Sequence, residues 1–177
     1  MTVCKGIMNV HGHSRAVVFE VDTSAGPVYM SLGETTCMDR RSVAIVDSGK
    51  FLALWRASPY LLHKEIATGN IDTWRRDSKY HYAEDGFTGG ITNPVPLAQV
   101  SYEFEEERGM FWRRILKLAP HEGSISFTDG ITRTLWLFCN GARSFPVEVA
   151  SNRAGMLSKV AGYKDCAAVD IQGLFCR

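Results

Sequence analysis

The chain has 177 residues, 45% of them hydrophobic, so it is long enough for one well-buried core but not for two large domains. Its 20 lysines and arginines against 19 acidic residues give a formal charge of +1, which excludes a strongly basic nucleic-acid-coating protein and an acidic disordered chain. We therefore expect a single domain over residues 1–177, with any basic site confined to a local cluster.

Cysteine usage and hydropathy indicate a cellular compartment. The 5 cysteines include no CxxC pair, and an odd count does not suit a disulfide framework, so a reducing cytoplasm is expected. The first residues lack the apolar centre of a signal peptide, and no run reaches the ~18 apolar residues of a membrane span. Peripheral contact with the inner membrane is the remaining alternative to a purely cytoplasmic location.

The amino-terminal part is predicted to be mainly β-structure. His11 and His13 have strand spacing that suits one metal ion, but no nearby residue completes a ligand set, so a mobile segment is expected there instead. Residues 16–32 predict a hairpin, because β-branched and aromatic residues flank a Ser/Gly/Pro turn. Residues 42–49 predict a third strand, whereas 50–55 fit a strand and a helix equally well.

The next segment is predicted to contain a short helix and a long loop. Ser58 can cap a helix and Pro59 suits its first position, while Gly69 supplies a stop, so a helix is expected over 59–67. Residues 70–93 are rich in glycine, aromatic residues and mixed charge, with little apolar periodicity. They predict a functional loop with one helical turn near Trp74.

Proline and a shift of alternation mark the following strand. The segment PVPLAQVSYEF, residues 94–104, predicts an edge strand with a bulge. Beyond it, residues 111–118 have apolar residues at helical spacing, and a second hairpin strand is the competing interpretation.

Residues 125–149 give the clearest local pattern. The letters SISF predict a short strand, and Ile131, Leu135 and Phe138 mark the buried stripe of a helix that Gly141 ends. The letters FPVEV predict another strand, and residues 151–162 predict a last helix before a tail. Strands and helices interleave, so the expected fold class is α/β (α+β).

The turn before this helix has the composition of an anion site. A helix that starts at Gly130 leaves backbone N–H groups unpaired, Arg133 can add a bidentate contact, and Thr132 and Thr134 can donate hydroxyl bonds. Asp129 suits such a site only as a helix cap or as the ligand of a bridging metal ion. The residues alone leave open a second interpretation, an ordinary Asp-Gly turn with a cap.

The longer pattern resembles the ParB/sulfiredoxin superfamily. PVPLAQV is followed by FTDGITRTLWLFCNGARSFPVEV, in which Gly130 and Arg133 match the glycine and arginine of the family's turn. Gly141-Ala142 match the end of its helix, and Phe145-Pro146-Val147 match its closing strand. The resemblance implies a compact mixed sheet flanked by helices over residues 92–150, with a family-specific half over 1–91 that carries a β-hairpin extension, and a helix and tail over 151–177.

Two departures narrow the chemistry. Sulfiredoxins place a nucleophilic cysteine where this chain has Ile131, so reduction of a sulfinic acid is not expected. Chromosome-partitioning ParB proteins have a histidine where this chain has Thr132, and too few residues follow Val149 for their helix-turn-helix. Centromere recognition is therefore not expected either.

The letters LALWRASPYLL and IDTWRRD make the chain similar to one group of this superfamily, the plasmid fertility inhibition factors. The resemblance implies a protein that blocks conjugative or T-DNA transfer by a type IV secretion system, through ATP binding and hydrolysis and metal-assisted DNA cleavage. The implied partners are the transferred DNA strand, a nucleotide, and secretion or coupling proteins. The alternative is a non-catalytic module that binds nucleotide or protein and obstructs the machinery.

These roles assign residues. Arg133 and Asp129 are the expected catalytic residues, and the nucleotide phosphates are expected at Gly130, Thr132, Arg133 and Thr134. Mg²⁺ would take Asp129 with a carboxylate from the run Glu103 to Glu107, Glu103 and Glu105 first, although such a run is usually a solvated face.

DNA contact is expected from local basic and aromatic residues. Trp74 offers a stacking ring beside two phosphate partners, and Lys79, Tyr80, His81 and Tyr82 follow closely. The residues assigned to DNA are Trp74, Arg75, Arg76, Arg113, Arg114 and Arg143.

Overall fold

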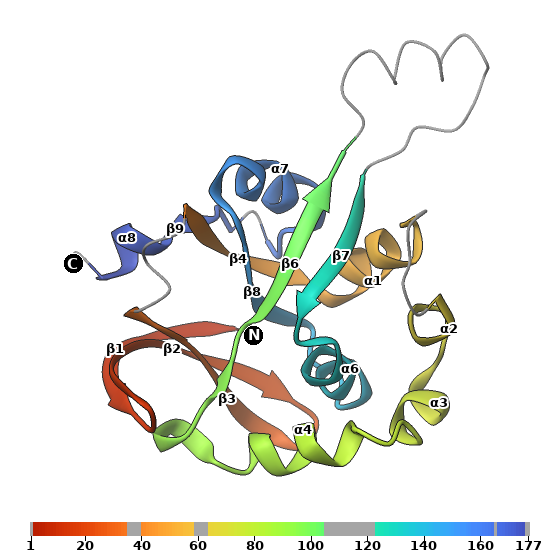
Figure 1. The fold of residues 1–177 in the computed structure, drawn as a ribbon, viewed down its shortest axis with the longest axis horizontal. Helices are drawn as coiled ribbons and strands as arrows, with labels where there is room; N and C mark the ends of the chain where they lie inside the picture. Colours follow the sequence, from red (N-terminus) through yellow and green to blue (C-terminus); the bar gives the residue numbers. More distant parts are fainter. Residues whose placement is uncertain (1, 35–39, 59–63, 105–122, 165, 176–177) are drawn as a thin grey trace, which may run out of the picture.

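The computed structural model describes residues 2–34, 40–58, 64–104, 123–164 and 166–175. Its strands form two sheets, a four-stranded sheet in the order β1-β2-β3-β5 and a five-stranded sheet in the order β7-β6-β8-β4-β9 (Figure 1). We call them the amino-terminal sheet and the central sheet. Both are mixed and helices surround them, so the predicted α+β class is confirmed.

The amino-terminal sheet begins with a three-stranded meander of β1 (Val3–Val10), β2 (His13–Thr23) and β3 (Gly26–Gly33). The hairpin expected over 16–32 is confirmed as β2 and β3. The mobile segment expected around the two histidines is wrong, because β1 pairs with β2 from Val3 opposite Glu20 to Val10 opposite His13. Its signal is weak because β1 is an edge strand whose side chains are exposed or half-buried.

Residues 41–56 form β4 (Arg41–Asp47) and then α1 (Ser48–Arg56). The strand is confirmed, and the ambiguous segment 50–55 is helical because the Asp47 side chain caps it, accepting from the N–H groups of Gly49 and Lys50 at 3.0 Å. The next helix, α2 (Lys64–Ala67), ends before Gly69 as predicted, while its expected start at 59–63 lies outside the described residues.

The long loop expected over 70–93 is wrong, although the helical turn expected near Trp74 is confirmed as part of α3. This segment contains α3 (Ile71–Arg75), α4 (Tyr80–Phe87) and a turn of 3-10 helix, η2 (Gly90–Thr92). The Asn70 side chain caps α3 in a capping box with Thr73. Each helix is so short that it buries only one to three residues, which gives too little periodicity for detection from sequence.

The strand expected over 94–104 belongs to both sheets. β5 (Val95–Pro96) lies parallel to β3 at the edge of the amino-terminal sheet, as its prolines predict. β6 (Ala98–Glu103) instead lies inside the central sheet, between β7 and β8, so the edge prediction is wrong for this half. The expected bulge is present where β6 pairs with β7, between Gln99 and Val100.

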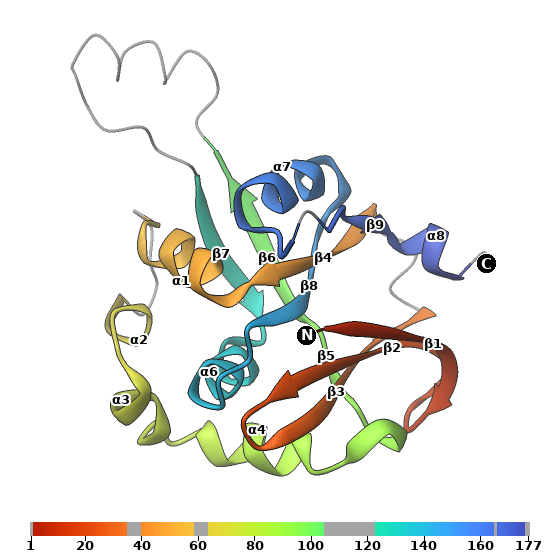
Figure 2. The same ribbon diagram turned by 180° about the vertical axis from the view of Figure 1, so that it is seen from behind.

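The carboxyl-terminal half follows the predicted order through its first four elements: β7 (Ser124–Asp129), α6 (Ile131–Cys139), β8 (Ser144–Ala150) and α7 (Ser151–Ala161). The segment expected to be only a tail instead contains β9 (Val169–Asp170) and α8 (Ile171–Phe175). Of the predicted stripe of α6, Leu135 is buried, while Ile131 and Phe138 are half-buried. Helices α1 and α7 cover one face of the central sheet (Figure 2). Residues 111–118, expected to form a helix or a strand, lie outside the described residues.

No helix in the described ranges combines the length and the apolar character of a membrane span.

Candidate functional site

Gly130 forms the turn between β7 and α6 and has a φ of 93°, in the left-handed region that favours glycine. A Cβ added there would lie 2.7 Å from Cα of Ala98 and 2.9 Å from Nη2 of Arg133. Glycine is therefore required because the turn packs directly against β6. From the sequence, the glycine is expected to leave room for a ligand. On this side of Gly130, Ala98 and Arg133 occupy that room instead.

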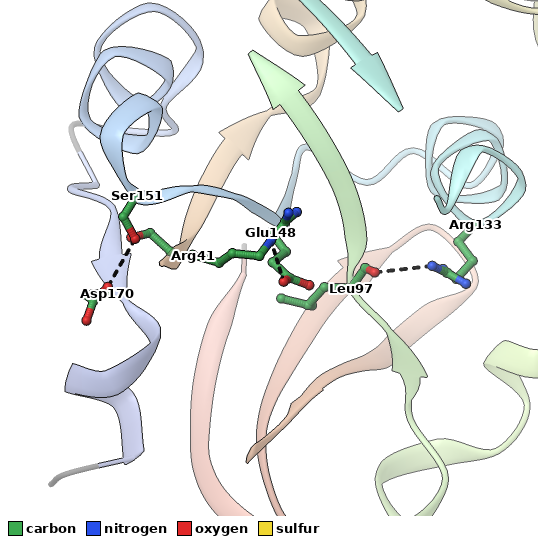
Figure 3. A network of polar contacts seen from close by, with 7 residues as sticks. Arg41, Leu97, Arg133, Glu148, Ser151 and Asp170 are labelled. Atoms are coloured by element: carbon green, nitrogen blue, oxygen red, sulfur yellow. Dashed lines mark hydrogen bonds and ion pairs between the residues drawn. The ribbon is translucent and has the colours of Figure 1, made fainter. Parts of the chain in front are cut away.

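Arg133 is held in place by the strands beside the turn. Its Nη2 donates to the carbonyl of Leu97 at 3.2 Å (Figure 3). The same atom donates to Oδ2 of Asp129 at 2.8 Å, and the side chain of Arg133 is 19% exposed. Among the described residues, no hydrogen-bond partner reaches its buried Nε. The guanidinium thus has a fixed position and spare N–H donors, which is the arrangement that binds an anion with little loss of side-chain entropy.

Asp129 does not take the capping role expected of it. Gly130 occupies the cap position of α6 and no side-chain cap bond is made there, so Asp129 does not cap the helix. Its carboxylate pairs with Arg133, and this hydrogen bond is the main reason that the pKa of Asp129 is lowered, against the opposing effect of partial burial.

Of the expected Mg²⁺ ligands, Asp129 and Glu103 do not come together. In the pairing of β6 with β7, Asp129 lies opposite Gln99, whereas Glu103 lies opposite Ser124 at the other end. A separation of four strand residues is about 13 Å, too far for two carboxylates to share an ion. Glu105 lies outside the described residues, and the described part of the chain contains no cluster of three or more His, Cys, Asp or Glu residues suited to a metal ion.

Thr132 and Thr134, the two threonines that follow the turn, have different roles in the structure. Thr134 is fully buried and its Oγ1 donates to the carbonyl of Gly130 at 3.0 Å, inside the helix. Its predicted contact with phosphate is therefore wrong. Thr132 is half-buried and lines a cavity together with Arg133.

This cavity, about 270 Å³ in volume, lies where α4, β5 and the first turn of α6 meet. Its lining residues are Lys79, Tyr82, Ala83, Val95, Pro96, Thr132 and Arg133. We call it the turn pocket. It brings Arg133 and Thr132 together with Lys79 and Tyr82, two residues that the sequence placed only in a separate DNA-contacting segment. Two cationic side chains and a hydroxyl then share one hollow, which suits a phosphate.

Packing between α4 and α6 fixes the second wall of the turn pocket. The rings of Phe87 and Trp136 stack with their centroids 4.4 Å apart, and Nδ2 of Asn140 donates to the hydroxyl of Tyr80 at 3.3 Å. These contacts set the position of the first turn of α4, which carries Lys79 and Tyr82 to the cavity.

Trp74 is not available for stacking on a base. It is 5% exposed, its Nε1 donates to the carbonyl of Ile66 at 2.6 Å, and its ring lies 5.7 Å from that of Phe138. The prediction that Trp74 binds DNA is therefore wrong, because the ring belongs to the hydrophobic core.

The basic residues assigned to DNA do not form one surface with the turn pocket. Arg75 is exposed but donates to the carbonyl of Cys139 at 3.3 Å, and Arg76 is exposed beside it. Arg143 lines a different hollow with Asp22, Thr23, Ser24 and Gly141, beyond the carboxyl end of α6. Arg113 and Arg114 lie outside the described residues.

Sequence reasoning missed a buried ion pair in the central sheet. Glu148 is 1% exposed on β8, and its Oε1 lies 2.7 Å from Nε of Arg41 on β4 (Figure 3). The signal was a single acidic residue in the otherwise apolar strand SFPVEVA, since a buried carboxylate needs a partner. Beside it, Oγ of Ser151 donates to Oδ1 of Asp170 at 3.2 Å and ties the start of α7 to β9.

Comparison with known proteins places the chain in a family. The family model described as plasmid fertility inhibition factor (PFIN) matches residues 43–162, from β4 to the end of α7. No curated protein sequence matches the chain. Among solved structures, it is similar to the crystal structure of oncogenic suppression activity protein, a plasmid fertility inhibition factor, as a gold(I) cyanide derivative. The TM-score is 0.70 at 24% identity, over 90% of this chain and 75% of that chain, so this likeness supports the fold.

Proposed function

The chain belongs to the plasmid fertility inhibition factor family, and we propose that it blocks conjugative or T-DNA transfer by a type IV secretion system through ATP binding in the turn pocket. The observation that carries the proposal is the meeting of Arg133, Lys79 and Thr132 in one cavity at the start of α6.

The start of α6 adds backbone donors to these side chains. The first intrahelical bond runs from the N–H of Thr134 to the carbonyl of Gly130, so the N–H groups of the preceding turn have no partner within the helix. No side-chain cap bond is made to them. Unpaired N–H groups and the positive end of the helix dipole favour an anion, and the two nearby cations add to this attraction.

Hydrolysis of ATP and cleavage of the transferred DNA are further activities that we propose for this fold. In the turn pocket, Arg133 would stabilise the negative charge that develops on the phosphoryl group, because its position is already fixed by Leu97. Asp129 and Glu103 do not fit a shared Mg²⁺, so we assign no metal-dependent step to them.

A second candidate function is obstruction without turnover, in which bound nucleotide controls an interaction with a secretion or coupling protein. The ion pair between Arg133 and Asp129 favours this function. Both residues were expected to be catalytic, but the Asp129 carboxylate is used to hold the Arg133 guanidinium in place. In this case nucleotide binding changes the stability and contacts of the protein, and no bond is broken.

A thermal-shift experiment tests the binding site. Wild-type protein, Arg133→Ala and Arg143→Ala are heated with ATP or CTP, with and without Mg²⁺. Bound nucleotide stabilises the fold in proportion to RT ln(1 + [L]/Kd), so we expect a shift for wild type and for Arg143→Ala, and its loss in Arg133→Ala. Arg143 is the matched control because it is an exposed arginine outside the turn pocket. An equal shift in all three proteins contradicts the proposed site.

Product assays on the same proteins separate the two functions. Phosphate release from ATP and nicking of DNA, both lost in Arg133→Ala, support the enzyme. Nucleotide binding with neither product above a mock purification, together with a stable complex with a secretion component, supports obstruction.

A further inference from the structure

Tyr82 is an aromatic side chain that the fold does not use. It is 68% exposed, more than any other large hydrophobic residue among the described exposed ones. Helix α4 packs through a different face, formed by Tyr80, Ala83 and Phe87. A tyrosine left in water on a helix of this size gains nothing from the core, so packing does not account for its identity.

The position of Tyr82 points to a ligand. Tyr82 lines the turn pocket together with Thr132 and Arg133, and its ring lies against the ring of His81 with the centroids 4.0 Å apart. His81 is also exposed, so the two rings form a small aromatic surface, and Tyr82 connects this surface to the cationic cavity that it lines. Aromatic rings beside phosphate-binding cations are the arrangement on which nucleobases stack.

The size of the turn pocket indicates where the parts of such a ligand lie. At about 270 Å³ it is smaller than the cavities of roughly 300–1,000 Å³ that enclose whole small-molecule ligands. The cavity therefore suits the phosphate end, held by Arg133, Lys79 and Thr132. The base would remain outside, at the rim, where Tyr82 is exposed.

We propose that Tyr82 is the base-stacking residue of the turn pocket, so that the pocket binds a nucleobase together with its phosphate and discriminates against a bare phosphate chain. The inference rests on the proposed function and deepens it by naming the recognised part of the ligand. The shared chemistry is a base joined to a phosphate, which either a free nucleotide or a DNA strand supplies.

Isothermal titration calorimetry on the full chain tests the proposal. The probes are ATP, inorganic triphosphate, a short oligothymidylate and an abasic oligonucleotide of the same length. We expect wild type to bind the base-containing probe about fivefold to 150-fold more tightly than its base-free counterpart, the range of one stacked base. Tyr82→Ala removes this preference while the affinity for triphosphate is unchanged, and Tyr82→Phe retains it.

Two controls make the result specific. Ile71→Ala removes an exposed apolar side chain outside the turn pocket and leaves the preference intact. Arg133→Ala weakens all probes, with and without a base. A preference seen with ATP identifies a free nucleotide as the ligand, and a preference seen only with the oligonucleotides identifies a DNA strand; both support the stacking role.

Equal affinity of wild type for base-containing and base-free probes overturns the role of Tyr82 but leaves a phosphate site at Arg133. Equal weakening of all probes by Tyr82→Ala also overturns it, since the residue then acts on the pocket as a whole. Absence of binding by any probe overturns both this inference and the proposed function.

Discussion

The two walls of the turn pocket are built in opposite ways. Helix α6 is bounded by glycines with positive φ at Gly130 and Gly141, and its Arg133 is bonded to Asp129 of β7 and to Leu97 between β5 and β6. The second wall is α4, which follows α3 in a segment of short helices. Of the two aromatic residues that this segment contributes to the comparison, Trp74 on α3 is 5% exposed in the core and Tyr82 on α4 is 68% exposed. The position of the first wall thus depends on the local turn glycines of α6, whereas the position of the second wall depends on contacts with residues distant in the sequence.

The largest expected effect is that of Trp74→Ala. Deletion of this buried ring lowers the free energy of unfolding by about 3–5 kcal/mol, the usual cost of a large aromatic cavity. Urea unfolding measures it, and Tyr82→Ala, an exposed substitution expected within about 0.5 kcal/mol of wild type, is the matched control. Equal stability of the two variants would abolish the contrast between the two aromatic residues.

A smaller effect is expected for Thr134→Val in the α6 wall. The substitution keeps the shape of the side chain but removes the buried hydroxyl bond to Gly130, so the free energy of unfolding falls by about 0.5–1.5 kcal/mol. Nucleotide affinity stays unchanged. Thr132→Val should show the reverse, a weaker affinity with little loss of stability. A large loss of nucleotide affinity in Thr134→Val would contradict this assignment and support the sequence-based prediction that Thr134 contacts the phosphate.

Asp129→Asn sharpens the role of the ion pair. The pKa of Asp129 lies below its ordinary value of 3.8, so the carboxylate is charged at neutral pH and competes with a phosphate for Arg133. Its removal is expected to strengthen ATP binding by about twofold to fivefold, the equivalent of one exposed ion pair. Glu103→Gln, at the far end of the same strand pair, should have no effect. If Asp129→Asn instead binds ATP more weakly than wild type, and does so only in the presence of Mg²⁺, Asp129 is a metal ligand.

The same pair predicts a small pH dependence of stability. Since the pKa of Asp129 is lowered in the folded state, the ion pair stabilises the protein above the ordinary pKa and the effect is lost as the pH falls through the lowered value. Asp129 is 66% exposed, so the contribution is below about 1 kcal/mol. Acid titrations of thermal stability for wild type and Asp129→Asn should converge below that pKa.

The smallest effect is expected for Arg76→Ala, which tests the remaining DNA prediction on the α3 side. If this exposed arginine contacts one phosphate, DNA binding weakens equally for all sequences and the salt dependence of log K falls by about 0.9. Arg75→Ala should change less, because its side chain is already bonded to Cys139. Unchanged salt dependence in both variants removes this surface as a DNA contact.

Residues 124–150 could be predicted from the sequence because their signals are local. Gly130 and Gly141 mark the ends of α6, β7 begins with alternating polar and apolar residues, and β8 is apolar except at Ser144 and Glu148. The same reasoning failed for residues 70–93, where each helix buries so few side chains that no period emerges. It also failed for β1, whose exposed edge position leaves no alternation to detect.

The sequence by itself determined the α+β class, the turn at Gly130 and the identity of Arg133 as its central cation, since these depend on backbone sterics and neighbouring residues. Only the tertiary structure decided that Thr134 is buried, that Asp129 pairs with Arg133, and that Lys79 and Tyr82 complete the turn pocket. The physical reason is that burial and pairing depend on which distant segments pack together. Here the stacked rings of Phe87 and Trp136 hold α4 against α6. The local sequence of neither helix predicts that these two rings meet.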